Sequence, residues 1–331
     1  MKLLDMLLAL CLPVCALAQV NVQAPVTDPS ALMAPWEPGA EDCDAPGPHR
    51  TIEVHHLSAD TQVFRQSPCV DYEANLLYLL IGDRSSLLID TGAVDGEWAD
   101  RTVVAVNSFL EDRGAGDRPL IVVHTHGHQD HRAGDSAFNE LRRVKMAPVE
   151  SAPLRAFLGI KDWPNDIAQI DLGNRIVDVI PTPGHHEDHA VFYDRKTRLL
   201  ITGDFLLPGR LLVRDIDAYR ASARRLAQFV RTHPVDHVLG AHIELDANGE
   251  LYASGSTWHP NERVLPLSAE DVLTLPSALE DFNGFYSRHA NYVVVNPVHN
   301  LLVLAGAVIL ALTLLVWMAR RVWKRRRASM A

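Results

Sequence analysis

The sequence has little positive charge outside one terminal cluster. Of its 331 residues, 41 are acidic and only 31 are basic, and six of the basic residues lie within the last twelve positions. An acidic body repels phosphate backbones, so nucleic acid is not an expected substrate or partner. The sequence also lacks a G-x-S-x-G turn, which presents a nucleophilic serine in many hydrolases. No feature indicates an obligate protein partner. The hydrophobic content of 47% nevertheless excludes a wholly disordered chain.

The N-terminal region has a single cation and only a short apolar run. Lys2 precedes the apolar residues Leu7 to Ala18, and Ala16 and Ala18 stand at −3 and −1 before Gln19. This pattern predicts a cleavable secretory signal peptide over residues 1–18, because the run is too short to span a bilayer. The six prolines of residues 19–50 predict an extended arm after it.

Residues 301–319 contain no charged residue. At a rise of ~1.5 Å per residue, a helix of this length measures about 28 Å, one hydrocarbon thickness. A basic cluster follows at once, and no Lys or Arg lies between Arg288 and Arg320. The asymmetry predicts a transmembrane helix in the lipid bilayer with a basic cytoplasmic tail, residues 320–331. The expected location is the cell inner membrane, with a single span and a periplasmic, or otherwise extracytoplasmic, body.

Cysteine is scarce as well. Of the four cysteines, Cys11 and Cys15 would leave with the signal peptide, so the mature chain would keep Cys43 and Cys69. In an oxidising compartment an even pair favours one disulfide, which would tie the arm to the domain. Two free buried thiols are the alternative.

Between the two ends, apolar runs of strand length alternate with helical stretches. Strands are expected at 75–81, 86–90, 119–124, 176–180, 189–193, 198–202 and 236–240, and helices at 99–112 and 216–232. Asp215 or Asp217 could cap the second helix. Because the strands come in pairs separated by helices, the pattern favours a layered α/β sandwich over a doubly wound sheet. We expect a catalytic domain over residues 51–265 and a connector over residues 266–300.

Residues that can bind metal follow several of these predicted strands. The segment 125–131 (THGHQDH) comes directly after one strand, and 182–185 (TPGH), 202–204 (TGD) and 240–242 (GAH) follow three others. The ends of strands in α/β folds are where functional sites gather. Imidazole and carboxylate together suit zinc, iron or manganese. The sequence therefore predicts a metal site built from several strand ends.

These motifs, together with LLIDTG at 87–92, resemble the metallo-β-lactamase-fold hydrolases in type and order, over roughly residues 51–245. The resemblance implies an α/β fold, a four-layered αβ/βα sandwich. It also implies two divalent metal ions, with Zn²⁺ expected and Fe or Mn as alternatives. The implied activity is hydrolysis of an ester, thioester or lactone carbonyl in a small-molecule substrate by a metal-bridging hydroxide.

Carried over position by position, the resemblance implies two ligand sets and a shared ligand. The residues for the first ion would be His126, His128 and His185, and those for the second would be Asp130, His131 and His242. Asp204 would bridge the ions. Asp90 would orient the ligands, and Asp90, Asp130 and Asp204 are the candidate catalytic residues.

Asp204 favours the glyoxalase II-like branch over zinc β-lactamases, which generally lack a bridging carboxylate. Strict glyoxalase II identity is not expected, because residues 243–290 offer only Arg263 and Arg288 for an anionic thioester. β-Lactam hydrolysis, an iron-dependent sulfur dioxygenase and a non-catalytic, membrane-anchored metal-binding protein are the alternatives.

Several residues near the motifs have open roles. His186 and His189 stand beside His185, and we expect neither to be a ligand. Arg210 and Arg214 follow the Asp204 strand and could bind an anionic substrate group or form surface pairs. A last pair, Tyr252 and His259, could reach the mouth of the site or lie on the surface.

Overall fold

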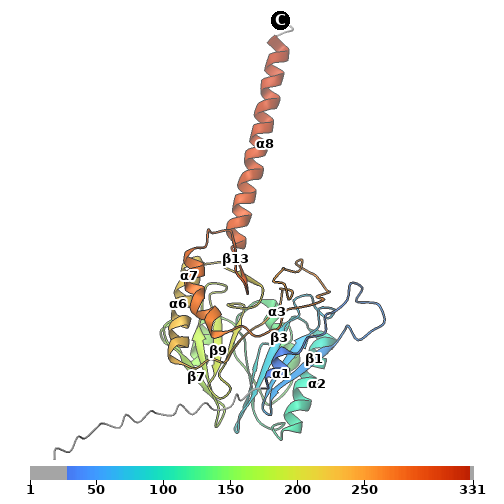
Figure 1. Ribbon diagram of the computed structural model, residues 1–331, viewed down its shortest axis with the longest axis vertical. Coiled ribbons are helices and arrows are strands. Elements are labelled where there is room, and N and C mark those ends of the chain that lie inside the picture. Colours follow the sequence, from blue (N-terminus) through green and yellow to red (C-terminus); the bar gives the residue numbers. More distant parts are fainter. Residues whose placement is uncertain (1–27, 329–331) are drawn as a thin grey trace, which may run out of the picture.

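The computed structural model describes residues 28–328 (Figure 1). The predicted signal peptide of residues 1–18, the arm as far as residue 27 and the last three residues of the basic tail lie outside the described residues. Figure 1 shows a body of strands and helices from which one long helix projects.

The first sheet has six strands in the order β1-β2-β3-β4-β5-β6. Their bounds are β1 (Ile52–Ser58), β2 (Thr61–Gln66), β3 (Leu76–Ile81), β4 (Ser86–Ile89), β5 (Leu120–Val123) and β6 (Val144–Met146). The pairs among β1, β2, β3 and β4 are antiparallel, whereas β4, β5 and β6 run parallel. β4 and β5 therefore end at the same edge of the sheet.

The second sheet has five strands in the order β12-β10-β9-β8-β7. Their bounds are β7 (Ala168–Asp171), β8 (Ile176–Pro181), β9 (Ala190–Asp194), β10 (Leu199–Gly203) and β12 (His237–Gly240). β9 is antiparallel to both β8 and β10, and β10 is parallel to β12. Consequently β8, β10 and β12 all end at one edge of this sheet.

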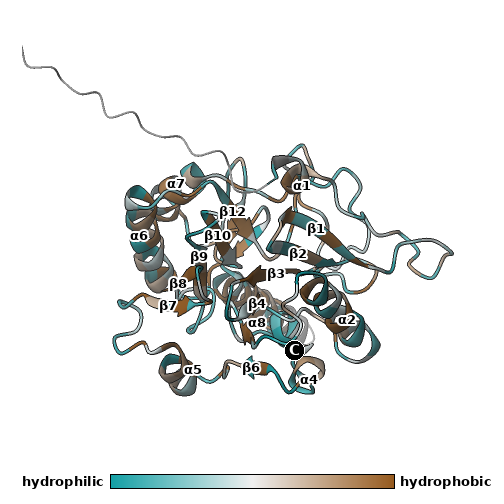
Figure 2. Cartoon of the chain, turned by 90° about the horizontal axis from the view of Figure 1, so that it is seen from below, coloured by the Kyte–Doolittle hydropathy of each residue, from teal (hydrophilic) through white to brown (hydrophobic). Residues whose placement is uncertain are grey.

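Helices cover the outer faces of both sheets (Figure 2). The helices of the described residues are α1 (Pro29–Met33), α2 (Gly96–Asp112), α3 (Gln129–Arg132), α4 (Asp135–Asn139), α5 (Ser151–Leu158), α6 (Ile216–Thr232), α7 (Ala269–Glu280) and α8 (Pro297–Ala328). α2 and α4 share a buried cluster with the first sheet, and α6 and α7 share another with the second. The Asp215 side chain caps α6 by accepting from the Asp217 and Ala218 backbone N–H groups.

The core between the sheets follows from the alternation of side chains along each strand. In β3, Leu76 and Leu80 lie in the cluster between the sheets, where Phe192 of the second sheet also lies. Leu77 and Leu79 face the other way, toward α2. A strand that is apolar on both faces must be covered on both sides. The layers are therefore helix, sheet, sheet and helix, which confirms the αβ/βα sandwich expected from the sequence.

A small third sheet lies where the chain approaches α8. It consists of β11 (Arg210–Leu212), β14 (Val293–Val295) and β13 (Tyr286–Arg288), with β11 parallel to β14. The segment 266–300, expected as a connector, thus contributes two strands and also α7. α7 begins with a capping box at Ser268 and buries Leu275 and Leu279 against α6. This segment is part of the folded body.

The Pro-rich arm is docked on the body along much of its described length. α1 packs Leu32 into the core between the sheets, and Gly39 forms a bridge with Trp258. Cys43 and Cys69 form a disulfide, as the sequence suggested. The arm is therefore fixed to the loop that precedes β3.

α8 is the one helix in residues 28–328 that is long and apolar enough to cross a membrane. Its candidate span is Pro297–Arg321, and none of the most apolar window is buried against the body. Figure 1 shows α8 projecting away from the sandwich. Because so many exposed apolar side chains are costly in water, this helix is a candidate to span a membrane.

Candidate metal centre

The edges at which both sheets end bring together all the ligand-type residues singled out in the sequence. His126 follows β5, and Asp130 and His131 lie in α3. His185, Asp204 and His242 follow β8, β10 and β12. Together they form two groups, in each of which the candidate ligand atoms lie within 4.8 Å of one another. The two halves of the sandwich thus meet at one site.

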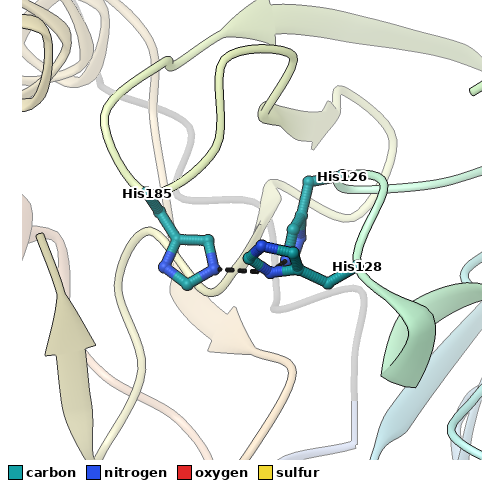
Figure 3. Close-up of side chains that lie close together, drawn as sticks. All are labelled: His126, His128 and His185. Atoms are coloured by element: carbon teal, nitrogen blue, oxygen red, sulfur yellow. Dashed lines mark hydrogen bonds between the residues drawn. The ribbon is translucent and has the colours of Figure 1, made fainter. Parts of the chain in front are cut away.

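The first group consists of His126, His128 and His185, whose rings point toward one another (Figure 3). Nδ1 of His128 lies 2.6 Å from Nε2 of His126 and 3.1 Å from Nε2 of His185. Three ring nitrogens at one point can bind a single cation when all three rings are neutral.

The second group consists of Asp130, His131, Asp204 and His242. Nε2 of His131 lies 3.1 Å from Oδ2 of Asp130 and 3.4 Å from Oδ1 of Asp204. Nε2 of His242 lies 3.2 Å from the same Asp204 oxygen. This set combines two carboxylates with two imidazoles, a donor set suited to zinc, iron or manganese.

Asp204 lies between the two groups. Its Oδ1 faces His131 and His242, whereas its Oδ2 lies 3.5 Å from Nε2 of His185 and 3.9 Å from Nε2 of His126. Gly203 before it has φ +52°, and a Cβ there would lie 2.6 Å from Cβ of Thr125. Glycine at this position therefore permits the close approach of β10 to the first sheet.

Asp90, at the end of β4, contacts the second group through Nδ1 of His131, the ring nitrogen that faces away from the other ligands. Its Oδ2 lies 2.9 Å from Nδ1 of His131, and its Oδ1 accepts from the Thr125 backbone N–H at 2.7 Å. The Thr125 hydroxyl lies 3.0 Å from Asp90 and 3.2 Å from Nδ1 of both His126 and His131. Such contacts orient metal-binding rings. Thr125 was not assigned a role from the sequence, although it stands between the strand and His126.

Two further rings are oriented by backbone carbonyls. Nδ1–H of His185 donates to the Leu212 carbonyl at 3.0 Å, and Nδ1–H of His242 donates to the Glu73 carbonyl at 2.6 Å. Each contact leaves the lone pair on Nε2, which faces the site. No side-chain pattern could reveal these partners, because the acceptors are main-chain atoms.

The charges of the site suit cations. Burial lowers the pKa of His126 well below its usual value and lowers that of His128 to about 4, so both rings are neutral at pH 7. Burial alone would raise the pKa of Asp204, but His242 and His131 hold it well below its usual value. In the second group the neighbouring carboxylates, Asp204 foremost, raise the pKa of His131 and His242 well above the usual value despite burial. A divalent ion that binds there would therefore displace a proton from each ring.

Three buried atoms at the centre make no well-aligned hydrogen bond. In residues 28–328 these are Nε2 of His131, Oδ1 of Asp204 and Nε2 of His128, although the first two lie in ion-pair contact with each other and with neighbouring ligands. Leaving the hydrogen-bonding capacity of buried polar atoms unused is costly. For His131 and Asp204 these atoms face the other members of the second group, so the residues present fit a bound metal ion there.

The other nearby histidines contact different groups. Nδ1 of His189 lies 2.8 Å from the Thr182 hydroxyl, and its ring stacks beside that of His126 at 5.2 Å. Nδ1 of His186 accepts from the Asp188 backbone N–H. Neither belongs to the two ligand groups. His124 pairs with Asp135 at 2.8 Å.

Two cavities flank the centre. One, of about 430 Å³, is lined by His185, Trp163 and Arg214. Arg214 is exposed and makes no ion pair in the described part of the chain. The other cavity, of about 240 Å³, is lined by Tyr72 and Leu212, together with Arg210, Tyr252 and His259.

Three of the residues with open roles, Arg210, Tyr252 and His259, make local contacts at the smaller cavity. Arg210 pairs with Glu244 at 2.8 Å, so its charge is balanced within the chain. The Tyr252 and His259 rings stack at 4.3 Å, and both line the cavity wall. Arg214 is therefore the cation better placed to meet an anionic group.

Comparison with known proteins agrees with this architecture. Residues 73–242 match the family model for the metallo-beta-lactamase superfamily. The acyl-coenzyme A thioesterase MBLAC2 of Gallus gallus is 26% identical over 214 residues, which cover 55% of this chain and 77% of that protein. The thioesterase pkgB of Emericella nidulans is 28% identical over 153 residues, 45% of this chain and 41% of that protein.

A solved structure is similar as well. It is a metallo-beta-lactamase from Pontibacter korlensis, which is 16% identical, with a TM-score of 0.47 over 70% of this chain and 100% of that chain. The family match spans more than half of the chain, from just before β3 to His242. The chain belongs to the metallo-beta-lactamase superfamily.

Proposed function

We propose that the chain is a binuclear, metal-dependent hydrolase that cleaves thioesters, with esters and lactones as related substrates. The observation that carries this proposal is the position of Asp204, whose two oxygens each face one ligand group. A carboxylate in this position can hold two ions close together. Zinc is the metal that we propose for both.

The thioester preference draws on the relatives. Two of them carry the names acyl-coenzyme A thioesterase and thioesterase. A third, from Passalora fulva, is named atrochrysone carboxyl ACP thioesterase. Their shared chemistry is attack on a thioester carbonyl, and we propose the same reaction here. In it, water adds to the carbonyl and the C–S bond breaks, which yields a carboxylic acid and a thiol.

The candidate ligands would bind two metal ions. His126, His128 and His185 would hold one ion, and Asp130, His131 and His242 the other, with Asp204 between them. Ions bound there would polarise the substrate carbonyl and lower the pKa of water toward 7. Asp90 accepts the ring proton of His131 and so keeps its Nε2 lone pair directed into the site. Burial of His126 excludes water from behind the first group.

The flanking cavities would bind the rest of the substrate. Arg214 lines the larger cavity, makes no ion pair with any residue from 28 to 328, and suits an anionic or strongly polar leaving group. The smaller cavity has an apolar wall at Leu212 and Ile243 and suits the acyl side. The carbonyl would then lie between the two cavities, at the metal centre.

The location of this activity is part of the proposal. We propose that residues 1–18 direct secretion, that residues 51–265 form the catalytic domain and that residues 301–319 of α8 anchor it in the inner membrane. The Cys43–Cys69 disulfide supports an oxidising compartment. The basic tail after α8 supports a cytoplasmic C-terminus.

Activity and metal content of the purified full chain test the proposal together. We expect about two equivalents of zinc and hydrolysis of a thioester that stops with a chelator and returns with zinc. His126→Ala should lower both the zinc content and the rate of thioester hydrolysis. His56 is an exposed histidine outside both groups, and His56→Ala should change neither quantity. One equivalent of iron with oxygen-dependent turnover would instead indicate a dioxygenase. Bound metal with no turnover of thioester, ester, lactone or β-lactam would indicate a binding protein.

A further inference from the structure

We infer that the candidate site opens toward the membrane that α8 enters, and that its substrate is an acyl thioester or ester whose chain lies in the bilayer. The inference rests on the proposed function, because it assigns a substrate class and a route of entry to the same site. It is carried by the connection between α8 and the metal centre.

A short chain of contacts joins the metal centre to the start of α8. The Leu212 carbonyl accepts from the ring of His185, and Leu212 pairs directly with Val295 in the third sheet. The Val213 N–H also donates to the Val295 carbonyl at 2.8 Å. Pro297, the first residue of α8, follows two residues later. Strand spacing and chain reach place it within about 12 Å of Leu212.

The direction of the third sheet fixes which end of the body meets the membrane. β11 and β14 are parallel, so the chain runs toward α8 in both strands. β11 ends beside the His185 loop, since the Gly184 carbonyl accepts from the Arg214 and Asp215 N–H groups. Figure 1 shows α8 leaving the body on the side where α3 lies, and α3 carries Asp130 and His131.

α8 also lies over the body rather than beside it. Seen along the vertical axis of Figure 1, the helix falls within the outline of the sandwich (Figure 2). A bilayer crossed by α8 along its axis would therefore extend over the site end of the body. The far end, where α2 terminates, would point into the aqueous compartment.

Exposed aromatic side chains lie between the body and the helix. Phe285 and Tyr286, beside β14, are 38% and 46% exposed. The Phe285 ring lies 4.4 Å from that of His299 in the first turn of α8, and its carbonyl accepts from the Asn296 N–H. Aromatic residues concentrate at membrane–water interfaces. Tyr72, 47% exposed, lies at the wall of the smaller cavity.

Leu212 links these features. Its carbonyl orients the metal-binding ring of His185, its side chain lines the smaller cavity and its backbone pairs with the strand that leads into the bilayer. An acyl chain that leaves this cavity toward the start of α8 would enter lipid without crossing water. A long chain can then stay in the bilayer while its carbonyl reaches the centre, which spares the cost of moving it into water.

The test compares two substrates that differ only in chain length. Full-length protein with zinc is reconstituted in phosphatidylcholine vesicles and given butyryl or hexadecanoyl thioester of N-acetylcysteamine. A helical spacer of four EAAAK repeats, about 30 Å long, is then inserted between Asn300 and Leu301. We expect the spacer to leave butyryl hydrolysis unchanged and to reduce hexadecanoyl hydrolysis about tenfold or more. The same spacer placed after Ala328, at the other end of α8, is the matched control and should change neither rate.

A second pair of variants tests the aromatic surface without changing the anchor. Tyr286→Ser should reduce only hexadecanoyl hydrolysis, by about threefold, whereas Val104→Ser, an exposed apolar residue on α2, should not. Equal hexadecanoyl rates with and without the first spacer would overturn the inference while leaving the proposed function intact. If the unmodified protein with zinc does not hydrolyse the butyryl thioester, the proposed function itself is rejected.

Discussion

Oδ2 of Asp90 lies 2.9 Å from Nδ1 of His131, and both side chains are fully buried. The carboxylate accepts the ring proton and so leaves the Nε2 lone pair pointing into the second ligand group. Asp90 itself adopts φ +67°, a strained conformation for a residue with a Cβ. The backbone at the end of β4 thus adopts an unusual geometry in order to place this one carboxylate.

Asp90→Asn should weaken metal binding at the second group. Asparagine keeps the shape but has only one acceptor oxygen, which cannot serve both the Thr125 N–H and His131. We expect the weaker of the two zinc affinities to fall by about 10- to 100-fold, measured by competition with a chromophoric chelator. Asp112→Asn, an exposed acid at the end of α2, is the control. Unchanged affinities in Asp90→Asn would contradict the orienting role.

Asp204→Ala should abolish most turnover while the protein stays folded. The side chain lies between the two groups, so its loss removes a ligand from each of the proposed ion sites. The zinc content should fall below two equivalents, and the cooperative thermal transition should persist. Zinc should also raise the Tm of this variant less than that of the wild type, because ligand binding stabilises the folded state by mass action. Activity near the wild-type value would show that Asp204 does not bridge ions.

Arg175→Ala should be strongly destabilising. The buried guanidinium pairs with Asp194 at 2.7 Å and donates to the Ile81 carbonyl of the first sheet, so it joins the two sheets. Removing it leaves a buried carboxylate unpaired, which costs about 3–5 kcal/mol. Urea unfolding followed by tryptophan fluorescence measures this loss. Arg84→Ala breaks the exposed Arg84–Asp171 pair and should change the free energy of unfolding far less than Arg175→Ala does, because solvent screens that pair. Equal losses of unfolding free energy in Arg175→Ala and Arg84→Ala would show that the buried ion pair stabilises the fold no more than the exposed one.

The orientation of α8 can be read with reporter fusions. A reporter active only outside the cytoplasm should work when fused near residue 295 and fail when fused after Ala331, because the cations at 320–327 oppose translocation of the tail. Cys43 and Cys69 should resist alkylation in intact cells until a reductant is added. Free thiols together with an inactive reporter at residue 295 would place the body in the cytoplasm.

Much of the sandwich could be predicted, because its central strands are continuous apolar runs. β3 and β10, for example, follow directly from their sequences. β1 and β2 escaped notice because they are rich in polar residues. Arg65, near the end of β2, is buried because it forms two hydrogen bonds with Glu262, which lies 197 residues away along the chain. α7 was missed as well, since it contains Pro276. Whether such segments form strands or helices depends on contacts with residues that are distant in sequence.

The side chains of the candidate site were easier to predict than what orients them. His126 and His128 stand in a dense motif after a strand, so the sequence indicates them directly. The carbonyls of Glu73 and Leu212 belong to residues with no such signal, and only the folded chain brings them to His242 and His185. The role of α8 as a neighbour of the site was equally hidden, because it depends on the pairing of β11 with β14.

One hydroxyl group connects the two halves of the centre. Thr125 carries a single hydroxyl hydrogen, which it gives to Asp90, so the nearby Nδ1 atoms of His126 and His131 must carry their own protons. The same oxygen thus sets the ring orientation in both ligand groups. An ion that binds to His126 in the first group fixes the orientation of that ring and of the Thr125 hydroxyl beside it. The same hydroxyl contacts His131 of the second group. The two ions should therefore load as a coupled pair, and half-loaded molecules should be scarce even when metal is limiting.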